Sequence, residues 1–172
     1  MKMSETLNEI RRRVSEENLT NSCGSSNCRV DTDNVPRERV VVNVDLAFEA
    51  HGGVVKHCDK ILFYISSTEN YLVVVLIEHK GGTFNSATEI AEQLQGGADF
   101  AKDKIMKDII PVDIKTICVP ALFHGSGSHQ SQFKKLRRQK IQFGNRKFPI
   151  SKDRCGASKN LANVLSRAGV LS

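Results

Sequence analysis

The sequence predicts an α/β fold with one mixed, four-stranded sheet flanked by helices. Two apolar runs rich in β-branched and aromatic residues, 61–65 and 71–77, are separated by the polar segment 66–70, a pattern typical of a β-hairpin. A stripe of Ala, Ile and Leu at helical spacing predicts a long helix over about 85–107, and residues 113–123 predict the next strand. Strand, helix and strand in this order indicate a right-handed crossover with parallel pairing.

Length and composition indicate one globular domain, which we expect to span 1–172. No apolar run approaches the roughly 20 residues that span a bilayer, and the first residues lack the apolar core of a signal peptide. The five cysteines are an odd number, so we expect reduced thiols in a cytoplasmic protein. The net charge of +6 favours a polyanionic partner.

The N-terminal part predicts a helix followed by a loop. Leu7, Ile10 and Val14 repeat at helical spacing within a helix over 4–18. Residues 20–38 are rich in Ser, Asn and Asp and predict a flexible loop. Within that loop, Cys23 and Cys28 have the spacing of half a zinc site, but no second pair of ligands follows at a suitable spacing, so we favour plain thiols.

Residues 39–49 predict the strand that precedes the central hairpin. Apolar side chains at 40, 42, 44, 46 and 48 alternate with a partly polar set, which indicates one buried face. This strand carries Asp45 and Glu49, which are alternative carboxylates for a functional site. The glycine-containing segment 50–53 would form the turn into the hairpin, and we interpret His51 and His57 as loop or surface residues.

The hairpin brings charged side chains together at its open end. If its turn centres on Thr68 and Glu69, opposed residues have numbers that sum to 137, and Asp59 lies opposite Glu78. Directly opposed Cβ atoms on one face are roughly 4.5–5.5 Å apart. Lys80 shares a face with Glu78 because side chains alternate along a strand.

Two adjacent carboxylates raise each other's pKa unless a cation lies between them. Oxygen ligands without Cys or His suit Mg²⁺ or Mn²⁺, and a nearby lysine can position water or stabilise charge on a phosphate. The alternative is a salt-bridged strand end without a chemical role. The register, the Gly81-Gly82 exit and the apolar run before Glu78 favour the metal site.

Over about 40–125 the chain resembles the PD-(D/E)XK nuclease superfamily: Asp59, eighteen intervening residues, then Glu78-His79-Lys80 on a buried strand that leads through Gly81-Gly82 into a helix. The chain departs from the motif at Cys58, where many members have Pro. The resemblance implies a restriction-endonuclease-like core of order αβββαβ. It also implies that Asp59, Glu78 and the main-chain carbonyl of His79 bind the metal, and that Lys80 orients the attacking water.

The same resemblance suggests two supporting residues. Some relatives carry a metal-supporting Glu on the first helix, and Glu17 is the candidate because it lies at the edge of the apolar stripe. Others use a Gln on the long helix, for which we take Gln93, with Gln95 as the alternative. The alternative is that none of the three has a function: Glu17 would be an exposed acid, and Gln93 and Gln95 would be glutamines that face solvent.

The C-terminal third predicts a flexible loop over 124–133, a hairpin over 139–150 with its turn at Gly144-Asn145, and a closing helix over 157–168. His124 and His129 lie in the loop, where contact with phosphate is an alternative to an ordinary surface position. A run of cations without any acid follows, and we expect it to contact phosphates: Lys134, Lys135, Arg137, Arg138, Lys140, Arg146, Lys147 and Lys152.

Together these observations predict a Mg²⁺-dependent endonuclease or exonuclease that hydrolyses nucleic acid, with DNA favoured, and has little intrinsic sequence specificity. A homodimer or a partner protein would then supply specificity, and the resemblance implies a role in bacterial antiviral defence or DNA processing. The alternatives are a non-catalytic nucleic-acid-binding subunit of a larger complex and a plain protein-interaction domain.

Overall fold

A computed structural model describes residues 3–50, 55–66, 70–82, 86–110, 114–125, 127 and 129–171. Its elements, in chain order, are α1 (Met3–Val14), a 3-10 turn (Glu16–Asn18), β1 (Arg39–Asn43), α2 (Val44–Ala50), β2 (Lys60–Ser66), β3 (Tyr71–Lys80), α3 (Ala87–Phe100), a π-helical turn (Ala101–Ile105), β4 (Lys115–His124), α4 (Gln130–Arg137), β5 (Lys140–Phe143), β6 (Arg146–Pro149), β7 (Ser151–Arg154) and α5 (Asn160–Arg167).

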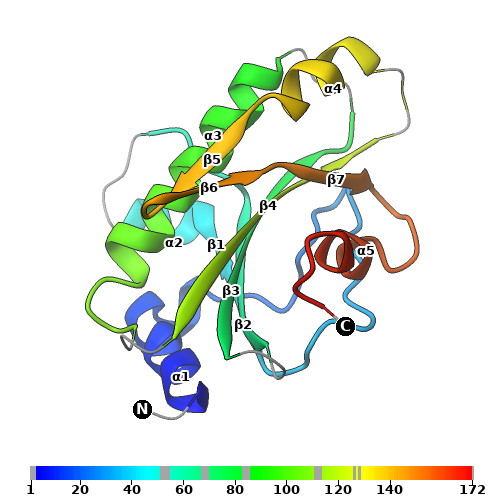
Figure 1. Cartoon of the computed structure of the whole chain (residues 1–172). Coiled ribbons are helices and arrows are strands. Elements are labelled where there is room, and N and C mark those ends of the chain that lie inside the picture. The colour runs from blue at the N-terminus through cyan, green and yellow to red at the C-terminus, as the bar shows by residue number, and fades with distance from the viewer. Residues whose placement is uncertain are drawn as a thin grey trace.

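Five strands form one mixed sheet in the order β1-β2-β3-β4-β7 (Figure 1). The first three are antiparallel, whereas β3, β4 and β7 are parallel, which confirms the α/β class and the parallel pairing predicted across the long helix. The sheet has one strand more than predicted. β7 reads Ser-Lys-Asp-Arg, and a strand without apolar residues gives no alternation that a sequence pattern can detect.

Both faces of the sheet are covered. On one face α1, α3, α4 and the β5–β6 hairpin pack over a core that includes Ile61, Phe63 and Leu76. On the other face α5 and the segment 23–35 pack over Leu62 and Tyr64. Figure 1 shows α5 and α3 on opposite sides of the sheet. No helix within the described part of the chain is both long and apolar enough to cross a bilayer.

The C-terminal elements agree with the prediction. β5 and β6 form a hairpin whose turn includes Gly144, with a φ of 65° that favours glycine. α5 buries Leu161, Val164 and Leu165 and is followed by Gly169, with a φ of 75°. The hairpin forms a separate two-stranded sheet.

The predicted strand over 39–49 is wrong in its second half, where the chain forms α2. The side-chain oxygen of Asn43 accepts a hydrogen bond from the Leu46 N–H (3.5 Å), which satisfies a donor in the first turn. α2 buries Val44 and Ala47 and leaves Leu46 45% exposed. The sequence of this segment satisfies both periodicities, so alternation alone could not exclude a helix.

The two predicted flexible loops are also corrected. Segment 20–38 lies on the sheet, with Cys23, Cys28, Val30 and Val35 buried. Within 124–133, α4 begins at Gln130. The first helix ends at Val14, earlier than predicted, because Ser15 adopts a positive φ of 75°.

Candidate active site

The predicted register of the central hairpin is confirmed. β2 and β3 pair with Lys60 opposite Ile77. The strand pairing stops there: the Asp59 N–H donates to the same Ile77 carbonyl (3.0 Å), so Asp59 lies at the open end, one residue past the last pair, where its carboxylate meets the carboxyl group of Glu78. The predicted turn at 68–69 and His51 lie outside the described residues.

Glu78 is enclosed at the end of β3, with 2% of its surface exposed. Its Oε1 lies 3.8 Å from Lys80 Nζ, and its buried Oε2 has no hydrogen-bond partner among the described residues. Burial first, and then the charge of Asp59, raise the pKa of Glu78, and Lys80 offsets only part of this increase. Without a cation, this carboxyl group therefore favours its protonated form.

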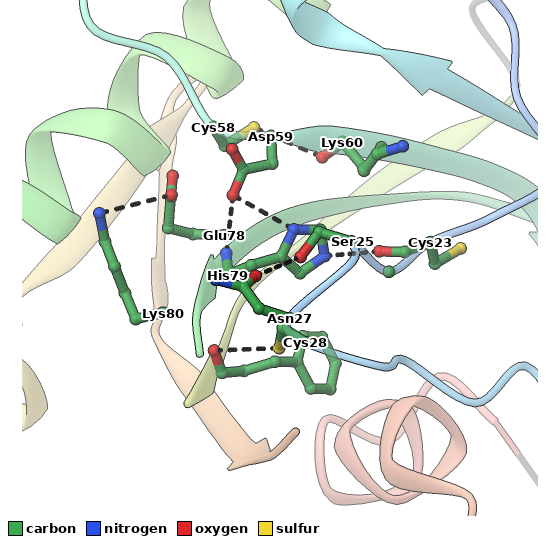
Figure 2. Close-up of polar contacts among 12 residues, drawn as sticks. Cys23, Ser25, Asn27, Cys28, Cys58, Asp59, Lys60, Glu78, His79 and Lys80 are labelled. Carbon is green, nitrogen blue, oxygen red and sulfur yellow. Dashed lines mark hydrogen bonds and ion pairs between the residues drawn. The ribbon is translucent and has the colours of Figure 1, made fainter. Parts of the chain in front are cut away.

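Asp59 is held differently. Its Oδ2 accepts a hydrogen bond from the His79 N–H (2.8 Å) and lies 3.3 Å from Nδ1 of the same residue (Figure 2). Burial raises the pKa of Asp59, but hydrogen bonds from the His79 ring, the Glu78 carboxyl group and the His79 N–H together lower it below its ordinary value. The pair thus carries about one negative charge, mainly on Asp59.

The donor set fits a divalent cation with oxygen ligands. The orphaned Oε2 of Glu78 is a buried acceptor that a cation would satisfy. The hairpin's backbone bonding ends at the Ile77 carbonyl, so the His79 carbonyl lies beyond it on the same edge of β3. No group of three or more His, Cys, Asp and Glu side chains suited to a metal occurs among the described residues. Mg²⁺ needs fewer, because it often uses one or two carboxylates and keeps several waters.

Close packing brings α3 to the site. At Gly97 an added Cβ would lie 2.3 Å from Cys58 Sγ, and at Gly96 it would lie 1.7 Å from the Lys56 carbonyl. Because neither glycine has a side chain, the segment just before Asp59 packs directly against α3 at these two positions. α3 continues through both glycines rather than ending there.

Gln93 and Gln95 differ in their surroundings. Gln93 lies one turn before Gly97 on the same helix face, and its buried Oε1 has no hydrogen-bond partner within the described residues. The amide of Gln95 is engaged with β5: it donates to the Gln142 carbonyl and accepts from the Gln142 N–H, both at 2.9 Å. Gln93 therefore remains the candidate, and Gln95 joins α3 to the hairpin.

The other candidate acids lie at the margin of the site. Glu17 is exposed in the 3-10 turn after α1 and stays a prediction. Asp45, at the start of α2, lies 3.5 Å from His57 Nε2, and its charge adds to the raised pKa of Glu78. Glu49 is exposed on α2. Of these acids, Asp59 is the one in contact with Glu78, and its ranking above Asp45 and Glu49 stays a prediction.

The prediction that all cysteines are reduced is wrong, because Cys28 forms a disulfide with Cys155. Cys23, Cys58 and Cys118 are buried free thiols. Burial raises the pKa of Cys23 to about 11, which disfavours the thiolate that zinc requires. Because Cys28 is bonded to Cys155, it is not available to pair with Cys23 as half a zinc site. A cytoplasmic location stays a prediction, since disulfides are typical of oxidising compartments.

The predicted cationic run divides into two groups. Lys134 and Arg137 lie on α4 along a groove shared with His129. α4 is joined to the site end of the sheet, since the Gly125 N–H donates to the Lys80 carbonyl (2.8 Å). Lys135, Arg138 and Lys140 are exposed. Lys152 Nζ lies 4.3 Å from the Phe133 ring centroid.

Arg146 and Lys147 belong to the other group. Arg146 lines a second groove with Lys115 and Thr116, at the start of β4. Eight residues separate Thr116 from His124, the residue paired with Lys80, so this group lies about 26 Å along the sheet from the site. The run therefore does not form one patch beside the carboxylates.

His124 and His129 are buried, not exposed in a flexible loop. His124 Nδ1 lies 2.9 Å from the Gly125 carbonyl oxygen. Burial lowers the pKa of the His124 side chain. The His124 and Phe133 ring centroids are 4.8 Å apart. Contact of these histidines with phosphate stays a prediction.

Sequence reasoning missed the contacts of the His79 side chain. Its Nε2 lies 2.6 Å from the Cys23 carbonyl oxygen, on a segment that was expected to be a loose loop. The motif assigned a role only to the main chain of His79, and no spacing in the sequence indicates a partner 56 residues earlier.

Comparison of the chain with protein-family models, curated proteins and solved structures finds no match. Membership of the nuclease superfamily therefore stays a prediction from the sequence motif.

Proposed function

We propose that the protein is a metal-dependent nuclease of the PD-(D/E)XK type, with a restriction-endonuclease-like core, that hydrolyses phosphodiester bonds, with DNA as the favoured substrate. One observation carries this proposal: the Asp59 and Glu78 carboxyl groups meet beside Lys80, with a buried and unsatisfied oxygen on Glu78. A buried carboxyl pair costs stability, so its retention is easier to understand if it binds a cation.

Asp59, Glu78 and the His79 carbonyl would hold Mg²⁺ or Mn²⁺. When bound, the cation would polarise the phosphate and activate water. Lys80, 25% exposed at its side chain, reaches both Glu78 and solvent, so its ammonium group can orient the attacking water or stabilise charge developing on the phosphate. The Oε1 of Gln93 is a further acceptor for a water molecule.

The test is cleavage of plasmid, linear duplex, single-stranded DNA and RNA with Mg²⁺. We expect Asp59→Asn and Glu78→Gln to lose both Mn²⁺ binding and cleavage. Lys80→Ala should lose cleavage by about 10²–10³-fold yet still bind Mn²⁺. Lys60→Ala is the matched control, because Lys60 is a half-buried cation on the other face of β2. Full cleavage by Asp59→Asn would contradict the proposal.

A second candidate is a nucleic-acid-binding subunit without activity. The cations of α4 favour it, because they would contact phosphates whether or not the carboxyl pair binds a metal. Salt-dependent binding that Asp59→Asn leaves unchanged, together with no cleavage of any substrate, would favour this function. In either case a homodimer or a partner protein would supply specificity, and defence or DNA processing follows from the resemblance alone.

The division of the cations gives a test of the binding surface. Removing Lys134 and Arg137 together should lower the slope of log binding constant against log salt by about 1.8, for two phosphate contacts on duplex DNA. The matched variant removes Arg146 and Lys147 together. These residues lie about 26 Å from the site, estimated at about 3.3 Å per strand residue. Their removal should therefore change the slope only when the duplex extends about eight base pairs or more beyond the cleavage point. Equal effects on short duplexes would contradict this arrangement.

A further inference from the structure

The His79 side chain joins the two faces of the sheet at the site. Because side chains alternate along β3, His79 points away from the face that carries Glu78 and Lys80. The side chain is 4% exposed. Its ring lies between the Cys23 carbonyl and the Asp59 carboxylate (Figure 2).

Both ends of this ring meet fixed acceptors. A carbonyl oxygen only accepts, so Nε2 carries the hydrogen at 2.6 Å from the Cys23 oxygen, which sets the orientation of the ring. At the other end, Nδ1 lies 3.3 Å from Asp59 Oδ2, and the His79 N–H donates to the same oxygen at 2.8 Å. Since both neighbours of the ring are acceptors, the two ring contacts are satisfied together when both nitrogens carry hydrogen, and His79 then holds one carboxylate oxygen through its ring and its main-chain N–H.

The segment that carries the Cys23 carbonyl is itself held firmly. Cys23 is fully buried, and the Ser25 N–H donates to the Cys28 carbonyl (2.9 Å). The disulfide from Cys28 to Cys155 ties this segment to the C-terminal part of the chain. At Gly81 an added Cβ would lie 2.3 Å from the Asn27 carbonyl oxygen, so the segment also packs directly on the exit of β3.

We propose that His79 is a positioning residue that fixes the Asp59 carboxylate for divalent cation binding by bracing it against the Cys23 carbonyl. The inference rests on the proposed function and adds to the site a side chain from the opposite face of the sheet. A fixed carboxylate does not lose rotational freedom when the cation binds, so the His79 ring strengthens binding without itself touching the cation, in addition to the ligand role proposed for the His79 main-chain carbonyl.

The experiment is a calorimetric titration, in which Mn²⁺ is added to the purified, metal-free protein in the absence of nucleic acid and the heat of binding is measured. We expect His79→Ala to weaken Mn²⁺ binding by about 10–100-fold. His79→Asn keeps a donor near the position of Nδ1, whereas His79→Gln keeps one near Nε2. Each should therefore give an intermediate loss. His57→Ala is the matched control, because the ring of His57 contacts Asp45 and the Cys58 carbonyl instead. The affinity of this variant for Mn²⁺ should stay as in the wild type.

A second readout separates positioning from general damage. In cleavage assays, the Mg²⁺ concentration for half-maximal rate should rise by the same factor as the Mn²⁺ dissociation constant. At saturating Mg²⁺ the KM for DNA should not change. A metal-independent loss of rate would overturn the proposal, because a brace for Asp59 acts through cation affinity.

The outcomes are distinguishable. Wild-type affinity in folded His79→Ala, with Asp59→Asn defective, would overturn this inference alone. If the wild type binds no Mn²⁺, or if Asp59→Asn and Glu78→Gln bind it normally, the proposed function fails and this inference fails with it. If His79→Ala does not fold, the Asn and Gln variants decide. Failure of all three to fold would show that the ring serves folding, which also overturns the inference.

Discussion

Replacing Glu78 by Gln should remove much of the pH dependence of stability of the metal-free protein. Burial and the neighbouring charge of Asp59 raise the folded-state pKa of Glu78 above its ordinary value of 4.5. Above that pH the unfolded chain loses the Glu78 proton while the folded protein keeps it. The stabilisation is therefore complete below about pH 4.5 and declines as the pH rises toward the folded-state pKa.

The magnitude follows from one proton. Each pH unit within this window changes the free energy of unfolding by at most about 1.4 kcal/mol, so two units give an upper limit of about 3 kcal/mol. Solvent screening does not reduce this limit much, because Glu78 is 2% exposed. For a chain of this length the limit corresponds to a fall in Tm of about 6–12 °C. The lowered pKa of Asp59 adds little slope here, since Asp59 is ionised throughout.

The assay is urea denaturation at about pH 5.5, 6.5 and 7.5 in a chelator, for wild type and Glu78→Gln. Subtracting the variant from the wild type removes the contribution of the histidines, which titrate in the same range. We expect the free energy of unfolding of the wild type to fall relative to that of the variant as the pH rises. When Mg²⁺ replaces the chelator, it should reverse this fall by favouring the ionised carboxylate pair. Identical pH profiles for the two proteins would refute this account of the carboxyl pair.

Two further predictions concern the segment that braces the site. Replacing Cys28 and Cys155 by Ser should lower the free energy of unfolding by about 2–4 kcal/mol, measured by urea denaturation, because the disulfide closes a loop of 127 residues; no change between oxidised and reduced wild type would contradict this. Gly81→Ala should cost about 1–3 kcal/mol through the clash with the Asn27 carbonyl, whereas Gly82→Ala, with open space around its Cβ, should lack this steric cost; equal losses in thermal denaturation would contradict the packing.

The central hairpin could be predicted because its information is local. Two apolar runs and a short polar break fix the register, and the register brings Asp59 and Glu78 to the same open end of the hairpin. The amphipathic stripe of α3 and the turn at Gly144 are equally local signals. The general α/β class followed from the order of these elements.

The remaining features depend on contacts between distant parts of the chain. Nothing near Cys28 indicates a partner at Cys155, and the polar strand β7 forms only because the edge of β4 is there to pair with it. The contact between His79 and the Cys23 carbonyl requires segment 20–38 to fold onto the sheet, which its polar composition argued against. At α2 the sequence fits two periodicities, and the capping contact of Asn43 with Leu46 accompanies the helix.

The most direct test is a crystal structure of the protein soaked with Mn²⁺, with anomalous scattering used to locate the ion. The account predicts an ion that contacts carboxylate oxygens of both Asp59 and Glu78, with Lys80 beside it. An ion bound elsewhere, or no ion between these two groups at a Mn²⁺ concentration that supports cleavage, would contradict it.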